Sequence, residues 1–528
     1  MLAGTALYLS ATSQLLFKTW KMNKKKIFTG IVLPFLLLSG CNKFEEINKN
    51  PDTITQASAS MVATSVILEN IKFNGRDAIA YLQPNALAKY IGYANESQMN
   101  AQYNKIGSTD FGIMTILPNI DKMLEYAKGS TMENSYKGLA KFSRAYMFYH
   151  TTMEVGDIPY SETNQGDKGN YRPKYDTQEQ VFIGILNELK EADTFFAQGI
   201  TFSGDPTPYN GDPAKWRRAS NAFALKVLMS LSKKENVASL NIKGRFAEIV
   251  ASGFILENST GYLGLKYSTT NMHPMSGTNN LFTSRTILSS LLIDNLKALN
   301  DRRLFYFADP AGAQIAGGKT QSDPAAYVGV DVSIDYEVMN QGHSANMYSL
   351  LNSRYLLESD SEPRMLMTYA EQQLILAEAY ILGWINTGSA QNYYESGVKA
   401  ALASVMATKA SYAHGMAIDQ NYINNYFTGE AAFKATPEEQ LKQIWMQRYI
   451  LNFMQNSESS YFEYRRNQYP VFPINPNTSL NENKKDAIPM RWLYPSSETN
   501  YNRENLIEAL DRQYEGYDEI NKLMWLLK

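Results

Sequence analysis

Apolar residues recur at helical spacing along most of the chain after its first few dozen residues. Between residues 176 and 192, one stripe of a 3.6-residue helix collects Val181, Phe182, Ile185, Leu186 and Leu189. Asp176 and Glu179 have the spacing of a capping box at the start of that segment. The pattern predicts an amphipathic helix over 176–192.

A second helix start is stronger. Thr436-Pro437-Glu438-Glu439 combines a capping hydroxyl, proline at the first helical position and glutamate three residues after the cap. Apolar residues follow at helical spacing through Tyr449. With few strand-like alternations elsewhere, the sequence predicts a mostly α-helical fold.

Three long stretches interrupt the helical pattern, namely 199–213, 260–280 and 309–341, and all are rich in glycine, proline and asparagine. Long segments without regular structure inside a compact domain are usually functional or disordered. We expect them to form irregular loops.

A basic start and a short apolar run lie near the N-terminus. Met22 begins the sequence MNKKK, and an apolar run over 27–40 ends in two small residues. A membrane-spanning helix needs about 20 apolar residues, and Pro34 interrupts this shorter run. Residues 1–40 are therefore predicted to contain a secretory signal peptide. Residues 1–21 fit no part of that signal and suggest an upstream start codon assigned in error.

The only cysteine of the chain, Cys41, directly follows this run. The tetrapeptide Leu38-Ser39-Gly40-Cys41 resembles a bacterial lipobox, in which the thiol receives diacylglycerol, cleavage occurs before the cysteine, and the new amino group is acylated. Two or three acyl chains hold a protein stably on a membrane, whereas one does not. We expect a mature lipoprotein, residues 41–528, anchored through Cys41. The alternative is an ordinary signal peptide that happens to end in a small residue.

The composition of the mature part narrows its function. Lysine and arginine, 50 together, nearly balance aspartate and glutamate, 52 together, so charge gives no reason to expect nucleic-acid binding. Without a second cysteine, no disulfide stabilises the fold. Tyrosine is abundant, at 35 residues. Since no flexible linker divides the sequence, residues 41–528 are predicted to form a single domain.

One helix pair carries a repeat pattern. The segment LAEAY, residues 376–380, has the leucine, small-residue and tyrosine spacing of the first helix of a tetratricopeptide unit. Ser389, Tyr393 and Ser396 follow where the second helix of such a unit has small, aromatic and small residues. Ala401 stands where the final proline of the unit would be. The pattern predicts a helical hairpin.

Several longer stretches, in order, resemble the SusD/RagB family of outer-membrane lipoproteins. They are CNKFEEINKNPD (41–52), FSRAYMFYHTTMEVGDIPYSE (142–162), 173–192, 212–232, 369–384, YFEYRRNQYPVFP (461–473) and PMRWLYPSSETNYN (489–502). The opening segment is typical of the SusD-like branch. The resemblance covers nearly the whole mature chain.

This resemblance implies a lipoprotein on the outer face of a Gram-negative outer membrane, beside a SusC-type TonB-dependent transporter that takes up nutrients. It implies a scaffold of tetratricopeptide-like hairpins with long irregular ligand-binding loops. Glu45 and Glu46 resemble the acidic signal that sends such lipoproteins to the cell surface.

The same resemblance leaves the ligand open. A non-catalytic protein that captures oligo- or polysaccharide is the leading interpretation. A peptide-capturing protein of the same transport system is one alternative, and a structural scaffold for partner proteins is another. Neighbouring glycosidase genes would favour the glycan, peptidase genes the peptide, and a missing transporter gene the scaffold.

Nothing in the residues selects an enzyme. An acylated Cys41 offers no thiol as nucleophile or metal ligand. The four histidines are scattered without an H-x-x-x-H pair, so neither a metal nor another cofactor is expected: His150, His273, His343 and His414. A glycosidase would need two paired carboxylates, and the sequence singles out no such pair.

Several large side chains in the family motifs are assigned to the fold. The tryptophans are expected in the core: Trp216, Trp384, Trp445 and Trp492. The arginines are expected to hold loops through carbonyl or carboxylate oxygens: Arg465, Arg466 and Arg491.

Ligand-binding residues are therefore sought in the loops. A sugar presents an apolar face of C–H groups and a rim of hydroxyls, so it is bound by flat aromatic rings and by polar groups at its edge. Loops 90–104 and 267–280, together with the surroundings of Tyr327, have this mixture. The predicted ligand contacts are Tyr93, Tyr103, Tyr267, His273 and Tyr327. Because these residues are placed in loops, alanine at Tyr93, Tyr103 or Tyr267 is expected to weaken binding and leave the fold intact.

Overall fold

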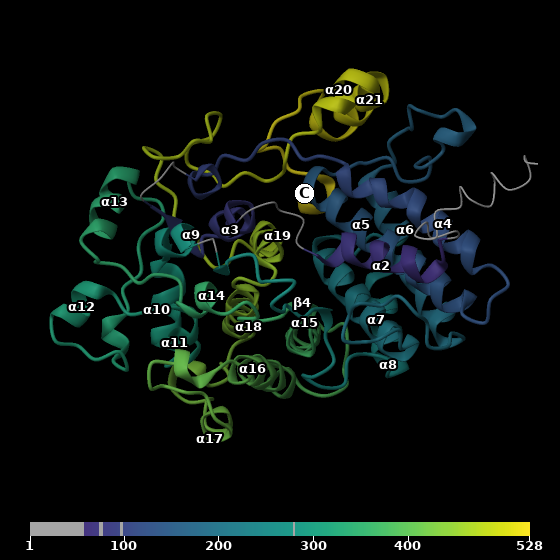
Figure 1. Cartoon of the computed structure of the whole chain (residues 1–528). Helices are drawn as coiled ribbons and strands as arrows, with labels where there is room; N and C mark the ends of the chain where they lie inside the picture. The colour runs from purple at the N-terminus through teal and green to yellow at the C-terminus, as the bar shows by residue number, and fades with distance from the viewer. Residues whose placement is uncertain (1–56, 73–77, 95–98, 278–279) are drawn as a thin grey trace, which may run out of the picture. The chain divides into compact units, whose positions relative to one another are not determined.

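The computed structural model describes residues 57–72, 78–94, 99–277 and 280–528, which belong to one unit spanning 57–528 (Figure 1). The predicted signal peptide, the lipidation of Cys41 and the surface signal at Glu45 and Glu46 lie outside these residues. They stay predictions.

Helices dominate the described residues. Their bounds are α2 Ala59–Ile71, α3 Ala78–Leu87, α4 Leu117–Ala127, α5 Glu133–Val155, α6 Gln178–Ala197, α7 Pro213–Ser230, α8 Ile242–Ser252, α9 Asn280–Arg285, α10 Ser290–Ala298, α11 Arg303–Phe307, α12 Gly312–Ala316, α13 Tyr336–Ser344, α14 Arg354–Leu357, α15 Tyr369–Ile381, α16 Ala390–Met406, α17 Gln420–Asn424, α18 Pro437–Asn452, α19 Ser457–Asn467, α20 Ser496–Tyr501 and α21 Arg503–Tyr514. Helices α5, α6 and α7 pack side by side with α2 and α4 at one end of the molecule, and α15, α16, α18 and α19 occupy its middle (Figure 1). The prediction of a mostly helical fold is confirmed.

Two short antiparallel ribbons complete the secondary structure. Strand β1 (Ile91–Tyr93) pairs with β3 (Thr286–Leu288), and β2 (Leu263–Leu265) pairs with β4 (Arg364–Met367). A side chain at Gly264 would meet the carbonyl oxygen of Arg364 at 1.9 Å, so only glycine lets β2 approach β4 this closely. This contact fixes the position of β4, and a cavity lies on each side of that strand.

The helix predicted over 176–192 exists, but its start was assigned one residue too early. Helix α6 is capped by Thr177, whose hydroxyl accepts from the backbone N–H of Gln180. In return, the side-chain oxygen of Gln180 accepts from the backbone N–H of Thr177. Asp176 instead accepts hydrogen bonds from the backbone N–H groups of Tyr160 and Ser161. The predicted apolar stripe is fully buried. At α18, the capping box of Thr436 and Glu439 forms as expected.

The predicted helical hairpin is formed by α15 and α16. Ser389 caps α16 by accepting from the backbone N–H of Asn392. Gly397 of α16 lies against α15, where a side chain would come within 3.0 Å of the Ala370 carbonyl oxygen. Helix α15 also packs on α7 and α18, so the hairpin joins the two helical groups. The tetratricopeptide-like scaffold is thus present.

The expectation of irregular structure over 309–341 is only partly right. Helix α12, a 3-10 turn at Pro324–Ala326 and the start of α13 lie in that stretch. Side-chain caps explain the 3-10 turn and the start of α13, since Asp323 accepts from the N–H of Ala325 and Asp335 from that of Glu337, whereas α12 has no side-chain cap. Aspartate at turn positions was a sequence signal for them.

Charged side chains meet in the core between α7, α15, α18 and α19. Three carboxylates face three cations in this buried ion cluster, made of Lys226, Glu371, Glu378, Arg448, Glu463 and Arg466. Arg466 contacts Glu378 at 2.7 Å and Glu463 at 2.6 Å. Although burial alone would raise it, Arg448 and Arg466 lower the pKa of Glu463 to about 2. The cluster ties four helices together.

The structural roles predicted for the arginines are confirmed. Arg465 donates to the carbonyl oxygens of Met490 and Met153 at 2.8 and 2.7 Å. Arg491 donates to the carbonyl oxygen of Glu519 at 3.1 Å and lies 2.6 Å from Asp518. Trp216 and Trp384 are buried as predicted, whereas Trp445 and Trp492 are half-buried.

Candidate functional site

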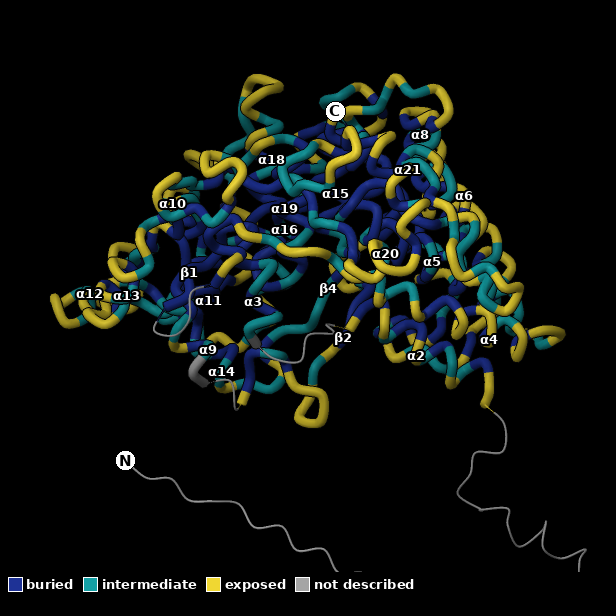
Figure 2. Tube along the Cα trace, turned by 90° about the horizontal axis from the view of Figure 1, so that it is seen from above, coloured by how far each residue is buried: buried dark blue, intermediate teal, exposed yellow. Residues whose placement is uncertain are grey.

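Two large cavities lie on opposite sides of strand β4. Successive side chains of a strand point to opposite faces, and Arg364 lines one cavity of about 440 Å³ while Met365 lines another of about 550 Å³. Gln455 lines both. Figure 2 shows β4 near the centre of the described unit. Both volumes are in the range of ligand-binding sites.

We call the smaller of the two the acidic cavity. Its lining includes Glu69, Asn70, Tyr81, Asp110, Tyr146, His150, Glu154, Arg364, Glu458 and Trp492. These residues come from α2, α3, α5, β4, α19 and the connecting segments, so the cavity exists only in the folded chain. Tyr146, His150 and Glu154 are spaced by four residues on one face of α5.

Trp492 is fixed at the wall of the acidic cavity. Its ring meets the rings of Tyr461 and Phe462 edge to face, with centroid distances of 5.4 and 6.4 Å. Its backbone N–H donates to the carbonyl oxygen of Glu154 at 3.0 Å. The indole is therefore both packed and partly open, which is the condition for a preformed stacking platform.

Carboxylates crowd one end of the acidic cavity. Burial, then the nearby charges of Glu458 and Asp110, raise the pKa of Glu154 to about 8, against the opposing effects of Thr109 and Arg465. The Thr109 hydroxyl donates to Glu154. Around neutral pH most Glu154 side chains thus keep their proton. His150 Nδ1 lies 3.5 Å from a Glu458 oxygen.

Asn70 supplies a further polar group. The side chain is 6% exposed, and its amide nitrogen donates to the Ser143 carbonyl oxygen at a long 3.5 Å. Its Oδ1 has no hydrogen-bond partner among the described residues. A buried acceptor without a partner costs free energy.

The larger cavity differs in chemistry, and we call it the aliphatic cavity. Alanine, valine, leucine and isoleucine side chains of α16 and α18 form much of its wall, among them Ala401, Val405, Ile450 and Leu451. Two pairs of its charged groups are bound to each other, since Arg354 lies 2.6 Å from Glu362 and Lys409 pairs with Glu358. Its described lining contains no tryptophan, whereas Trp492 borders the acidic cavity.

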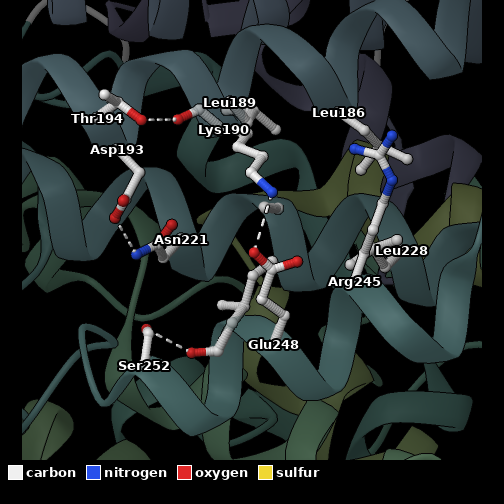
Figure 3. A pocket seen from close by; sticks show the side chains of 12 residues that line it. Leu186, Leu189, Lys190, Asp193, Thr194, Asn221, Leu228, Arg245, Glu248 and Ser252 are labelled. Atoms are coloured by element: carbon white, nitrogen blue, oxygen red, sulfur yellow. Dashed lines mark hydrogen bonds and ion pairs between the residues drawn. The ribbon is translucent and has the colours of Figure 1, made fainter.

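A third and smaller cavity, of about 110 Å³, lies between α6, α7 and α8 (Figure 3). Leucines line it, and Lys190 pairs with Glu248 at 3.0 Å among its side chains (Figure 3). Its volume is below the range of sites that enclose a ligand. The acidic cavity is therefore the candidate functional site.

The loop placement predicted for the ligand residues holds for Tyr267, His273 and Tyr327, but it is wrong for Tyr93 in strand β1 and for Tyr103 in the 3-10 turn Asn100–Tyr103. Tyr93, Tyr103, His273 and Tyr327 are at most 2% exposed. Tyr93 lies in β1 against β3, and the segments 99–104 and 324–336 pack back onto the core. Ligand contact by these side chains stays a prediction, and their burial counts against it.

Contacts explain why these rings are buried. Tyr103 donates its hydroxyl to the Ile334 carbonyl oxygen at 3.0 Å, and Tyr327 to that of Gln321 at 2.8 Å. His273 has ring neighbours on three sides, and burial followed by the charges of Arg354 and Arg364 lowers its pKa to about 3. His273 is therefore neutral.

Tyr267 is the predicted contact that stays half-buried. It meets His273 edge to face at 5.1 Å, and His273 Nε2 lies 3.4 Å from the hydroxyl of Tyr81. Tyr81 lines the acidic cavity. The predicted residues thus reach the candidate site only through this chain of rings.

Neither a metal site nor a membrane-spanning helix is found among the described residues. No set of three or more histidine, cysteine, aspartate or glutamate side chains within the described ranges has the geometry to hold a metal ion. Among the helices described, none is long and apolar enough to cross a membrane.

Comparison with known proteins shows which family and which solved structures this chain resembles. A family model described as "starch-binding associating with outer membrane" matches residues 47–495. No curated protein matches the chain. Among solved structures, a SusD homologue from Bacteroides fragilis is 40% identical, with a TM-score of 0.85 over 89% of this chain and 100% of that one.

More distant structures share the fold. A Bacteroides vulgatus protein, described in terms of the outer membrane and nutrient binding, is 32% identical with a TM-score of 0.81 over 89% of this chain and 100% of that one. A chitin-binding SusD homologue from Flavobacterium johnsoniae is 20% identical, with a TM-score of 0.68 over 89% of this chain and 98% of that one. The chain belongs to the SusD-like family, whose members are described as starch-binding and associated with the outer membrane.

Proposed function

We propose that the chain is a cell-surface lipoprotein that captures oligo- or polysaccharide in the acidic cavity and delivers it to a SusC-type TonB-dependent transporter. The observation that carries this proposal is the family match over residues 47–495. The cavity of about 440 Å³ gives the proposal a location.

The lining of the acidic cavity supports a glycan over a peptide. Trp492 and Tyr81 offer ring surface to the C–H face of a sugar, while the carboxyl groups offer acceptors to its hydroxyls. An extended peptide that adds a strand would instead use unpaired backbone groups at a strand edge, and Arg364 is the residue of β4 in this lining. The chitin-binding relative is consistent with a glycan.

The binding that these groups support is moderate. Each hydrogen bond to a sugar hydroxyl replaces one to water, so its net gain is about 0.5–1.5 kcal/mol. A few such bonds with one stacked ring lead to a micromolar dissociation constant, roughly −8 kcal/mol. Moderate affinity suits a protein that must release its ligand to a transporter.

A binding experiment tests the proposal. Calorimetry against a panel of oligosaccharides and peptides should give micromolar binding to a glycan, with no product after long incubation. Trp492→Phe should weaken that binding ~3–10-fold, since a smaller ring covers less of the sugar. The matched control is Trp525→Phe, because Trp525 is also half-buried but lies in the C-terminal 3-10 turn outside the cavity. Peptide binding alone, or cleaved product, would contradict the proposal.

Membrane attachment through a lipid on Cys41 is tested by cell fractionation. Cys41→Ala, expressed with its own signal, should leave the outer-membrane fraction or stay uncleaved in the inner membrane. Unchanged maturation and location would disprove the lipid anchor.

Partnership is tested by extraction of the native protein in mild detergent. The net charge of −2 supplies little long-range attraction, so docking should depend on a large complementary surface. A TonB-dependent transporter should co-purify. Repeated purification of other proteins without a transporter would favour the scaffold alternative.

A further inference from the structure

We infer that the aliphatic cavity is a second binding site, which takes a medium-chain aliphatic carboxylate with its hydrocarbon chain on the wall of α16 and α18 and its carboxylate at Arg303. The site goes beyond the proposed function and does not depend on it, since this cavity lies across β4 from the acidic cavity. Its volume of about 550 Å³ is in the range of ligand-binding sites.

Arg303 is a buried member of the cavity lining with apolar neighbours. It is 1% exposed and belongs to α11, and Phe307, one turn further along that helix, lines the cavity as well. Arg303 Nη2 donates to Gln447 Oε1 of α18 at 2.7 Å. Ile450 and Leu451, about one turn beyond Gln447 on α18, are also in the lining. Apolar side chains of two helices therefore lie beside this guanidinium.

One nitrogen of the Arg303 guanidinium is unused. Nε and Nη2 donate to Asp301 at 2.5 to 3.1 Å, and Nη2 also donates to Gln447. Nη1 has no hydrogen-bond partner among the described residues. The arginine nitrogens that lack a partner and are sealed from solvent belong to other residues, among them Arg448 and Arg465. Nη1 is therefore open to the cavity, where its two N–H donors are available to a ligand.

Exposed apolar side chains adjoin the cavity. Leu357, 65% exposed, directly precedes the lining residue Glu358. Met406, 36% exposed, lies between the lining residues Val405 and Ala407. Exposed apolar surface beside a cavity is a feature of ligand-binding grooves. Together with the aliphatic wall, it favours a hydrocarbon chain over a sugar, whose rim of hydroxyls needs polar partners.

The charges of the lining leave a place for one carboxylate. Four positively charged residues stand against three carboxylates in the described lining: Lys266, Arg303, Arg354 and Lys409 against Glu358, Asp360 and Glu362. Arg354 pairs with Glu362, and Lys409 pairs with Glu358. Asp301, the partner of Arg303, has no exposed side-chain surface and is not part of the lining. A ligand carboxylate would therefore make the charges of the lining equal.

A carboxylate fits the free nitrogen of Arg303 better than a hydroxyl does. It only accepts hydrogen bonds, so it can meet two N–H donors without a donor of its own to satisfy. Hydrogen bonds between charged groups are also stronger than neutral ones. The ligand is thus defined by an aliphatic chain and an acidic end, and each of these can be varied separately.

The experiment is a calorimetric titration with hexanoate, octanoate, decanoate and octan-1-ol. It uses the mature chain with Cys41→Ala in detergent-free buffer, because acyl chains and detergents are themselves aliphatic ligands. Each added methylene should tighten binding ~2–4-fold, which is the gain expected from burying most of that group. Octanoate should bind on the order of 10-fold more tightly than octan-1-ol, since only octanoate gives Arg303 a charged acceptor.

A cavity-filling variant locates the chain. Ala403→Leu places a larger side chain in the cavity from α16 and should weaken decanoate binding on the order of 10-fold, because it takes the space of several methylenes. The control is Ala417→Leu, since Ala417 is also half-buried against the core but lies outside the lining. That variant should bind decanoate as the unaltered protein does.

A second variant locates the acidic end. Arg303→Lys should bring octanoate and octan-1-ol to within ~3-fold of each other, because a single ammonium group would be held by Asp301. Thermal unfolding checks that this variant folds. The comparison of acid with alcohol on the unaltered protein asks the same question without any substitution.

The outcomes are distinct. Affinity that does not rise with chain length, equal binding of octanoate and octan-1-ol, or equal effects of Ala403→Leu and Ala417→Leu would each overturn this inference and leave glycan capture standing. Displacement of decanoate by a saccharide would overturn it as well, and would move the glycan to the aliphatic cavity. Failure to bind any saccharide while decanoate still binds would overturn the proposed function alone.

Discussion

Glutamates in two neighbouring regions of the same scaffold have opposite ionisation. In the buried ion cluster, Arg448 and Arg466 outweigh burial and lower the pKa of Glu463 to about 2. In the acidic cavity, burial together with Glu458 and Asp110 raises the pKa of Glu154 to about 8. Both regions lie against α19, which supplies Glu463 to one and Glu458 to the other.

The difference distinguishes a region that holds the fold from one that is ready for a ligand. In the ion cluster every carboxylate contacts a cation of the chain itself. In the acidic cavity the carboxyl groups outnumber the cations beside them, and Asn70 keeps an acceptor without a partner among the described residues. Carboxylates that contact cations of the chain stabilise the fold, whereas carboxyl groups crowded together without enough cations are available to a ligand.

The largest effect is expected from Glu378→Ala in the ion cluster. Glu378 contacts Arg448 at 3.3 Å and Arg466 at 2.7 Å, and accepts from the Trp445 indole N–H at 2.9 Å. Its removal leaves two buried cations under-compensated, so the free energy of unfolding should fall by about 3–5 kcal/mol. Chemical denaturation measures this loss. The control, Glu438→Gln in an exposed pair, should lose no more than about 0.5 kcal/mol. A loss below ~1 kcal/mol for Glu378→Ala would contradict the role of the cluster.

A smaller effect, with a definite pH dependence, is expected from Glu463→Gln. The folded pKa of Glu463, about 2, is below its unfolded value of about 4.3. Its ionisation therefore stabilises the fold above the unfolded pKa, and this contribution is lost as the pH falls through about 2. The variant should be ~2–3 kcal/mol less stable near pH 6, with the difference shrinking towards pH 2. Urea denaturation at several pH values tests this, and a pH-independent difference would argue against charge as the cause.

Glu154→Gln in the acidic cavity should change the stability of the protein in the opposite direction to Glu463→Gln. The folded pKa of Glu154, about 8, is above the unfolded value of about 4.3, so the fold loses stability as the pH rises from about 4 to about 8. Glutamine avoids this loss and should stabilise the protein by ~1–2 kcal/mol near pH 7.5, after allowance for the part of the side chain that solvent reaches, with little effect at pH 4. Thermal unfolding at both pH values measures it. Destabilisation at pH 7.5 would mean that the two regions do not differ as described.

The smallest effect concerns one of the buried tyrosines. Tyr103→Phe removes a hydroxyl that donates to the Ile334 carbonyl oxygen at 3.0 Å and should cost about 0.5–1.5 kcal/mol of stability. It should leave glycan affinity unchanged, because Tyr103 does not line the acidic cavity. Calorimetry and denaturation of the same sample separate the two effects. Weakened binding without lost stability would restore Tyr103 as a ligand contact.

Local patterns predicted the parts of the molecule that depend on neighbouring residues. The stripe of α6, the capping box of α18 and the α15–α16 hairpin were all visible as spacing along the sequence. The prediction that the tyrosines contact a ligand did not foresee their burial, because a position in a loop does not show how a side chain packs. Tyr327, for example, meets Phe305 edge to face at 5.0 Å in the core.

The candidate site could not be predicted from the sequence for a related reason. Asn70 and Trp492 are separated by more than four hundred positions in the sequence and line one cavity only after folding. The one local signal was the four-residue spacing of Tyr146, His150 and Glu154 on α5, which puts an aromatic, a base and an acid on one face. Trp492 lay in a family motif and was assigned to the core, although it also borders the cavity.

The most direct test of the account is a crystal structure of the mature chain with the tightest-binding oligosaccharide from the calorimetric panel. The account predicts an intact saccharide in the acidic cavity, stacked on Trp492. A saccharide bound in the aliphatic cavity, or on the surface away from β4, would contradict the assignment of the site. A cleaved saccharide would contradict capture without chemistry.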